Sequence, residues 1–360
     1  MQLNLFIFIL ILFFILKSNE SEEWFFKKFI CIITTVLIIV SSLRNKAVGS
    51  DTYRYILSLE QSVYRNWSEI IQHFYDSYFY PTQTQKDPGY LLIEKVISSV
   101  TTDQIFFFVT IAILTLVPLA IFIYKNCDSK FGLVISYMYF LSLIYNNIPN
   151  QIVRMSIAFS LVCLSYLSLM KNKNVLFIFL ILIASSIHKS VLILLLFWAV
   201  QRYVKAKYFF YLTPFLFSFV AFSPKSIVSF LEGNVGAYES YINGNSTASL
   251  NILFVMIFVY LVMLIGLNRS DELWEENQLA ITGATFTIVL TPVVLIDSVL
   301  FRLCSYFAPW LMILLPKTIN AIPEFKNILY IIFLTMFLYL AINAPEYRFF
   351  WQYMELNDSY

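Results

Sequence analysis

Long apolar runs separated by short polar connections repeat along most of this chain. The runs Leu3–Leu16, Phe25–Leu43 and Ile105–Tyr124 approach the length at which an α-helix crosses the hydrocarbon core of a bilayer. The pattern predicts an all-α, polytopic integral membrane helical bundle with about 11 to 12 transmembrane helices. The predicted segments are residues 3–16, 25–43, 105–124, 131–146, 152–170, 174–187, 189–203, 207–222, 250–268, 278–297, 300–319 and 327–343.

The pair 174–187 and 189–203 has two interpretations, because only His188 separates its two apolar runs. A helix of about 14 residues rises about 21 Å, which is less than the roughly 30 Å of a hydrocarbon core. The pair is therefore either a tight hairpin of two spans or one broken long helix, and a re-entrant pair buried in protein would accommodate the short lengths.

Composition narrows the classes of protein further. The chain is 59% hydrophobic and 13% charged, and its net charge of +2 gives no support to a nucleic-acid partner. Two histidines are too few for a multi-histidine metal site, and four scattered cysteines indicate neither a disulfide framework nor a zinc site. We therefore expect a single membrane domain over residues 1–360, with neither a metal nor a cofactor.

Basic residues alternate between the connections and predict the sidedness of the chain. Thirteen of them fall on one set of short connections, which the positive-inside rule assigns to the cytoplasm. The opposite set, the long segment 44–104 and both termini are then expected outside. The basic residues of the cytoplasmic set are Lys17, Lys27, Lys28, Lys125, Lys130, Lys171, Lys173, Arg202, Lys205, Lys207, Arg269, Lys317 and Lys326.

Two outer loops are more than connectors. In the extracytoplasmic loop 44–104 we predict two amphipathic helices, Thr52–Val63 with Asp51 as its N-cap and Tyr90–Val100, both lying at the outer interface. The many aromatic residues of this loop favour interfacial packing or, as an alternative, stacking on sugars. The extracytoplasmic loop 223–249, which contains several glycines, is expected to act as a flap.

Five polar or charged residues fall at the outer ends of predicted segments that are distant in sequence. Each has an ordinary interpretation too: an arginine near the end of a span can reach lipid phosphate, an aspartate can cap a helix, and a histidine in a turn can be interfacial. Their placement on one face favours a shared site. The five are Asp51, Arg54, Arg154, His188 and Arg302.

The chemistry of this set suits a phosphate-containing ligand. Arginine binds phosphate with two parallel hydrogen bonds, and its charge stabilises a departing pyrophosphate. A histidine or an aspartate can remove the proton from an attacking hydroxyl. The sequence contains no Asp-x-Asp pair, no Walker loop and no Gly-rich dinucleotide motif, so it predicts metal-independent chemistry without a nucleotide cofactor.

At these residues the chain resembles the EpsG-like branch of the Wzy-type polysaccharide polymerases, which make O-antigen or capsule. The segment around Asp51 is similar to that family's Gly-x-Asp-x-x-x-Tyr stretch, and Asp87-Pro88-Gly89-Tyr90 is similar to its Glu-x-Gly-Tyr segment. Ser50 and Asp87 depart from the residues most frequent there. In chain order, the resemblance rests on Val48–Tyr55, Asp87–Leu92, Arg154–Ala158, Ala184–Ser190 and Arg302–Phe307.

The resemblance implies a multi-pass enzyme of the bacterial inner (cytoplasmic) membrane that joins undecaprenyl-pyrophosphate-linked oligosaccharide repeats at the outer face. Membrane lipid and a chain-length regulator are the further partners expected. Arg154 and Arg302 would bind the donor pyrophosphate with help from Arg54. His188 is the first candidate for the general base, and Asp51 is the second.

Two other classes of membrane protein stay open from sequence. A flippase or exporter of the same lipid-linked sugars would also be polytopic and contain arginines, but it would need polar groups along a path to both faces. A membrane O-acyltransferase would need an acyl-donor site reaching the cytoplasmic side, and the sequence shows no candidate for one.

Overall fold

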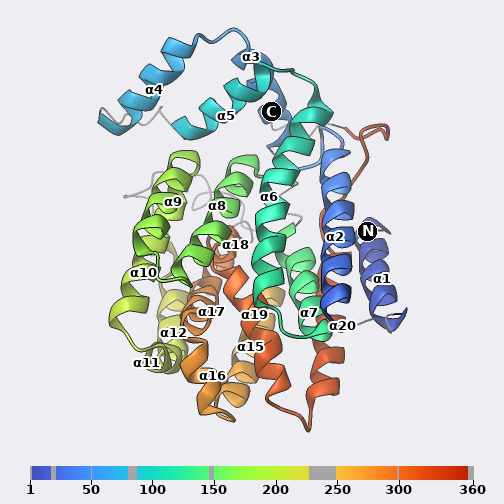
Figure 1. Cartoon of the computed structure of the whole chain (residues 1–360), viewed down its shortest axis with the longest axis vertical. Helices are drawn as coiled ribbons and strands as arrows, with labels where there is room; N and C mark the ends of the chain where they lie inside the picture. The colour runs from blue at the N-terminus through green and yellow to red at the C-terminus, as the bar shows by residue number, and fades with distance from the viewer. Residues whose placement is uncertain are drawn as a thin grey trace. The chain divides into compact units, whose positions relative to one another are not determined.

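The computed structural model describes residues 2–17, 22–49, 51–79, 87–145, 150–226, 249–297 and 300–355. Their secondary structure is helical, without a β-strand (Figure 1). The chain divides into two compact units. Unit 1 comprises Met1–Tyr124, Leu141–Leu192 and Ala341–Tyr360, and unit 2 comprises Lys125–Phe140 and Ile193–Leu340.

Unit 1 contains the N-terminal helices and a later helical hairpin, and the C-terminal residues rejoin it. The segment after Ala341 runs back to the end of the second helix, where the backbone N–H of Phe350 donates to the Leu43 carbonyl at 2.8 Å. The helices are α1 (Gln2–Lys17), α2 (Glu22–Ser42), α3 (Thr52–Ser62), α4 (Trp67–Phe79), α5 (Pro88–Ser98), α6 (Gln104–Asn126), α8 (Val153–Leu169) and α9 (Asn174–Ile187), with a 3-10 turn at Lys189–Leu192.

Unit 2 packs around a cluster of aromatic rings. Phe286 and Phe307 stack with their centroids 4.9 Å apart, and the buried Trp310 lies beside Phe197. Its helices are α7 (Lys130–Tyr139), α10 (Ile193–Tyr203), α11 (Ala206–Tyr211), α12 (Thr213–Phe222), α15 (Leu250–Leu267), α16 (Asp271–Glu276), α17 (Gln278–Leu290), α18 (Phe301–Ser305), α19 (Ala308–Asn320) and α20 (Lys326–Ile342).

The helices coincide with the apolar segments predicted from the sequence, and the predicted all-α membrane fold is confirmed. Among the described residues, four helices are long and apolar enough to cross a bilayer: Trp24–Ser42, Gln104–Asn126, Leu250–Leu267 and Gln278–Leu295. Several other apolar helices are shorter, so the number of 11 to 12 spans stays a prediction. The sidedness of loops 44–104 and 223–249 is also still predicted, and residues 227–248 lie outside the described residues.

Two predicted spans are divided into separate helices: 207–222 forms α11 and α12, which meet at Leu212, and 300–319 forms α18 and α19. The continuous helix expected over residues 300–319 is wrong, because α18 ends at Ser305 and α19 begins at Ala308. Pro309 occupies the first turn of α19. Proline has no backbone N–H to donate, so it is tolerated at a helix start and breaks a helix interior. Arg302 is therefore carried by a short helix of its own.

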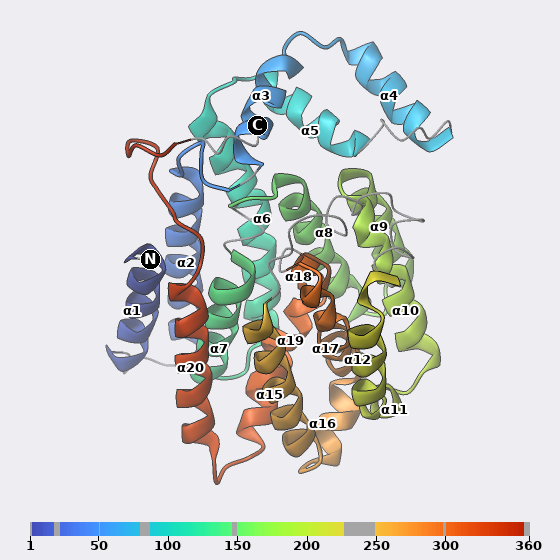
Figure 2. The same ribbon diagram turned by 180° about the vertical axis from the view of Figure 1, so that it is seen from behind.

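Helices α8 and α9 form a hairpin and lie side by side in both views (Figures 1 and 2). Only residues 170–173 connect them, and Asn172 takes the left-handed conformation (φ 57°) that such a tight reversal requires. Helices joined by so short a connection run antiparallel. The beginning of α8, with Arg154, and the end of α9, with His188, therefore lie at the same end of the hairpin.

The segment between α2 and α6 contains three helices, although the sequence pattern predicted two. Helices α3 and α5 confirm the predicted amphipathic pair, whereas α4 was not anticipated. The ammonium of Lys95 on α5 donates to the carbonyls of Ser62 and Val63 at the end of α3, at 3.0 and 3.2 Å. A cation at a helix C-terminus satisfies carbonyls that have no partner within the helix.

Two glycines allow this segment to approach the hairpin. Gly49 has a φ of 83°, and a Cβ there would lie 2.6 Å from Cγ of Gln151, just before α8. A Cβ on Gly89 would lie 2.2 Å from Oγ of Ser186 in α9. Thr52, the first residue of α3, donates to the Asn150 carbonyl at 3.2 Å. The starts of α3 and α5 are thus both held against the end of the hairpin that carries Arg154 and His188.

We predict that Gly89→Ala destabilises the protein, because the added methyl group forces α5 away from α9. Overpacking of this kind costs about 1–3 kcal/mol, so the melting temperature of the purified protein in detergent should fall. Adding Ser186→Gly should recover part of the loss by removing the atom that the methyl group meets first. An unchanged melting temperature in the single variant would contradict this close contact.

Candidate active site

A buried ion pair joins the start of α8 to the start of α5. Nη1 of Arg154 donates to Oδ2 of Asp87, and 34% of the Arg154 side chain and 9% of the Asp87 side chain are exposed. Asp87 precedes α5 immediately, and Arg154 is the second residue of α8. The sequence pattern indicates Arg154 as a site residue but carries no sign that Asp87 is its partner.

Two tyrosines complete the surroundings of the guanidinium. Nε of Arg154 donates to Oη of Tyr55 at 3.4 Å, and the guanidinium carbon lies 5.9 Å from the centroid of the Tyr55 ring. The ring of Tyr90 packs edge-on against Tyr55, with centroids 5.6 Å apart. Both tyrosines are buried, so they fix one side of the arginine and leave its exposed part as the accessible cationic surface.

Asp87 adopts an unusual backbone conformation, with φ 52° and ψ 58°. Left-handed backbone at a residue other than glycine costs roughly 1–2 kcal/mol, and the residue before a proline normally prefers extended backbone. Such conformations persist only where the surroundings enforce them, and they cluster at functional sites. The ion pair with Arg154 is one interaction that holds Asp87 in this conformation.

His188 lies at the end of α9, next to the ion pair. Its backbone is extended and its N–H donates to the Ala184 carbonyl at 2.9 Å, while its side chain is half-buried. Burial raises the pKa of Asp87, and Arg154 and the neighbouring Lys189 act against that shift. The close approach of Gly89 to Ser186, two residues before His188, places the end of α9 beside the start of α5, which Asp87 directly precedes. Arg154, Asp87 and the His188 turn therefore lie together in unit 1.

The remaining predicted residues take three different positions. Asp51 occupies the N-cap position of α3 as expected, but its side chain makes no capping hydrogen bond. It lies one helical turn before Tyr55, whose backbone N–H donates to the Asp51 carbonyl at 3.1 Å, so Asp51 is on the same side of α3 as this site tyrosine. Arg54 is on the exposed face of the same helix. Arg302 belongs to unit 2, where it is half-buried between the buried Phe301 and Leu303.

Glu94 is a further carboxyl group that sequence reasoning missed. It follows Tyr90 by one helical turn on α5, is completely buried, and accepts a hydrogen bond from Oγ of Ser58 on α3 at 2.8 Å. Burial raises the pKa of Glu94 above its ordinary value. The sequence signal for Glu94 was its spacing from Tyr90 and Asp87, because residues three or four apart share one helix face.

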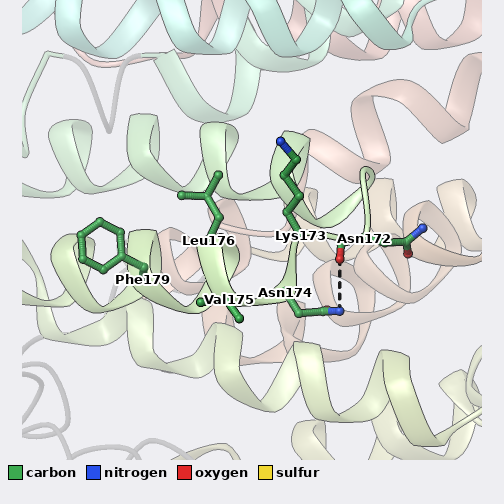
Figure 3. A pocket seen from close by; sticks show the side chains of 6 residues that line it. All are labelled: Asn172, Lys173, Asn174, Val175, Leu176 and Phe179. Carbon is green, nitrogen blue, oxygen red and sulfur yellow. Dashed lines mark hydrogen bonds between the residues drawn. The ribbon is translucent and has the colours of Figure 1, made fainter.

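A surface pocket near the hairpin is not part of this site. It is lined by Asn172, Lys173, Asn174, Val175, Leu176 and Phe179 at the α8–α9 turn (Figure 3). Because α9 has 14 residues and rises about 1.5 Å per residue, this turn lies about 20 Å from His188. In the described part of the chain, no cluster of His, Cys, Asp and Glu has the makings of a metal site.

We predict that Glu94→Gln changes the pH dependence of stability. Since the folded pKa of Glu94 lies above the unfolded one, the stability contribution of this group is complete below pH 4.5, its ordinary pKa, and decreases as the pH rises through the folded value. Glutamine does not titrate and still accepts from Ser58. The melting temperature of the variant relative to the wild type should therefore increase with pH above 4.5. A constant difference between the two proteins would contradict the raised pKa.

Comparison with known proteins identifies a family that agrees with the resemblance seen in the sequence. The model of the EpsG family matches residues 27–354, which cover nearly the whole chain and both units. No curated protein and no solved structure shows a significant match. Because the match extends over all the segments discussed above, the chain belongs to the EpsG family, the family of Wzy-like polysaccharide polymerases.

Proposed function

We propose that this protein is a glycosyltransferase that polymerises undecaprenyl-pyrophosphate-linked oligosaccharide repeats at the outer face of the bacterial inner membrane, in which it is a multi-pass protein. The observation that carries the proposal is the partly exposed Arg154, held by Asp87 and Tyr55 beside the His188 turn. A fixed cation next to a candidate base is the minimum that transfer from a pyrophosphate requires.

Arg154 would bind the pyrophosphate of the donor. Asp87 and Tyr55 hold two of its nitrogen atoms, so the guanidinium is oriented before the ligand arrives and loses little freedom on binding. Its charge would stabilise the negative charge that develops on the leaving pyrophosphate. Arg54, exposed on α3, would assist. Arg302 keeps the donor-binding role proposed from its sequence segment.

We propose that the transfer of the donor chain to the acceptor hydroxyl proceeds without a metal ion. His188 would take the proton from a hydroxyl on the non-reducing end of the acceptor repeat, and the oxygen would attack the anomeric carbon of the donor chain. The bond from that carbon to the pyrophosphate oxygen breaks, and the electron pair leaves with undecaprenyl pyrophosphate. The proton on His188 then returns to solvent. Asp51, on the site side of α3, is the second candidate for the base or would orient a sugar.

The two outer loops and the expected partners have roles in the same proposal. Loops 44–104 and 223–249 would shape the cleft for the sugars, with α3 and α5 forming its described part. Membrane lipid surrounds the helices, and a chain-length regulator is the proposed protein partner. The rival function is a flippase or exporter of the same lipid-linked sugars. The two functions differ in whether cells without the activity still display single repeat units at their surface.

We predict that Arg154→Ala lowers polymer formation by at least about 10²-fold, since removal of one group that stabilises transition-state charge costs about that much. Cells that carry only this variant should still display single repeat units at their surface, because repeats are exported and not joined. The measurement is the size profile of lipid-linked and surface glycans, with membrane levels of the protein checked by immunoblot.

Arg348→Ala is the matched control for this arginine. Arg348 is exposed in unit 1 and pairs with Glu346 at 2.6 Å, and surface ion pairs contribute about 0–1 kcal/mol. Its loss should leave the glycan profile unchanged. Full-length polymer from Arg154→Ala would remove this arginine from the site, and the absence of even single repeats at the surface would favour the flippase.

We also predict that His188→Ala abolishes long-chain polymer, whereas Asp51→Asn reduces polymer by about 10-fold or less. The imidazole is the proposed proton acceptor, and general-base catalysis contributes about 10²–10⁴-fold. Asparagine keeps the size and hydrogen-bonding oxygen of Asp51, so an orienting role would largely persist. Initial rates of chain growth on purified lipid-linked repeats distinguish the two. If Asp51→Asn is the inactive variant and His188→Ala is active, the base is Asp51.

A further inference from the structure

Helix α4 carries an apolar face that is about half or more exposed among the described residues. Trp67, Ile71, Tyr75 and Phe79 follow one another at four-residue intervals and therefore form a stripe along one side of the helix. Their side chains are 47, 60, 48 and 64% exposed. The rings of Tyr75 and Phe79 stack with centroids 4.5 Å apart, which makes the end of the stripe a continuous aromatic surface.

The other two sides of α4 either contact protein or carry polar residues. Ile70 is buried, and α4 packs on α5 in unit 1. A polar side carries Glu69, which accepts from the N–H of Asn66, and Asp76, which accepts from Nε2 of Gln72 at 2.8 Å. One side of the helix therefore contacts protein, one is hydrophilic, and the apolar stripe needs another environment.

Chain topology places α4 at a membrane surface. Both α2 and α6 contain segments long and apolar enough to cross a bilayer, and the helices described between Ser42 and Gln104 are α3, α4 and α5. When one span ends and the next begins, the connecting segment is on one face of the membrane. In both views these three helices lie beyond the ends of α2 and α6 that they connect, and α4 extends away from those two helices, beyond the ends of α8 and α9 (Figures 1 and 2).

A second aromatic group lies at the end of α2. The turn Phe349–Gln352 is hydrogen-bonded to the end of α2 through Leu43 and Asn45. Its Phe350 and Trp351 side chains are exposed. Aromatic side chains are enriched where spans meet the headgroup layer, so this turn marks the depth at which α2 leaves the hydrocarbon.

We propose that α4 lies in the headgroup layer of the bilayer, with the stripe Trp67–Ile71–Tyr75–Phe79 buried among lipids. Aromatic and aliphatic side chains opposite a polar side are the pattern of a helix lying in the interface, where the apolar side enters roughly 5–10 Å. The helix contains no lysine or arginine. Its attachment therefore rests on apolar burial and does not require anionic lipids.

Membrane attachment of α4 bears on the active site, a consequence that rests on the proposed function. Helix α4 packs on α5, and Asp87 directly precedes α5 and pairs with Arg154. The depth of α4 would set the height of this ion pair relative to the headgroups, where the pyrophosphate of a lipid-linked donor lies. Attachment itself is measured without any assay of polymerisation.

The test is nitroxide labelling of the full-length protein in vesicles of phosphatidylethanolamine and phosphatidylglycerol. The four native cysteines are replaced, and single cysteines are introduced as Ile71→Cys and Tyr75→Cys on the stripe. Gln72→Cys and Asp76→Cys are the matched controls, one position further along the helix. We expect oxygen to relax the stripe labels several-fold more than a water-soluble nickel chelate does, and the reverse at the controls.

Two results would overturn the proposal. If all four labels are nickel-accessible, the stripe faces water. If the stripe labels resist both reagents, protein covers them, for example a second copy of the chain.

If the cysteine-free protein fails to fold, two tryptophan variants that keep the native cysteines, Ile71→Trp and Gln72→Trp, provide a second test. Brominated lipids should then quench the fluorescence added at position 71 and not that added at position 72, and equal quenching would overturn the proposal.

Discussion

The ion pair between Arg154 and Asp87 is the interaction on which the arrangement of unit 1 depends. Asp87 is largely buried, and a buried carboxylate without a partner is unfavourable, whereas the partly exposed Arg154 supplies the opposite charge. The pair therefore ties α5, which belongs to a polar segment, to α8, which belongs to an apolar hairpin. Tyr55 joins α3 to the same point, so three elements distant in sequence meet at one guanidinium.

Close backbone approach makes this ion pair possible. A side chain at position 49 would collide with Gln151, which lies just before α8. A side chain at position 89 would collide with Ser186, which lies near the end of α9. Glycine occupies both positions. The left-handed backbone of Asp87 turns the chain just before Pro88, and α5 then runs on toward its contacts with the end of α3. Packing contacts and polar contacts thus support the same geometry, and this agreement explains how an exposed segment holds a partly buried charge.

The polymerisation that we propose rests on what surrounds the cation. An arginine that only reached lipid phosphate would have a mobile, solvated side chain. Arg154 is instead oriented by a carboxylate and a phenol, and the end of α9 that carries His188 lies beside the carboxylate. Such fixed charges favour a transition state in which negative charge develops on a pyrophosphate. Membership of the EpsG family gives this arrangement its chemical context.

The amino-acid sequence by itself predicted the helical membrane fold and the positions of most long helices, and it supplied the candidate site residues. Apolar periodicity is local information, and helices form from local contacts. It did not reveal α4, the interruption before Pro309, or the pairing of Asp87 with Arg154. Those depend on contacts between residues far apart in the chain, and a carboxylate before α5 carries no local sign of the arginine it will meet. Only the tertiary structure, by folding α5 onto the α8–α9 hairpin, decided which of the predicted charges share a site.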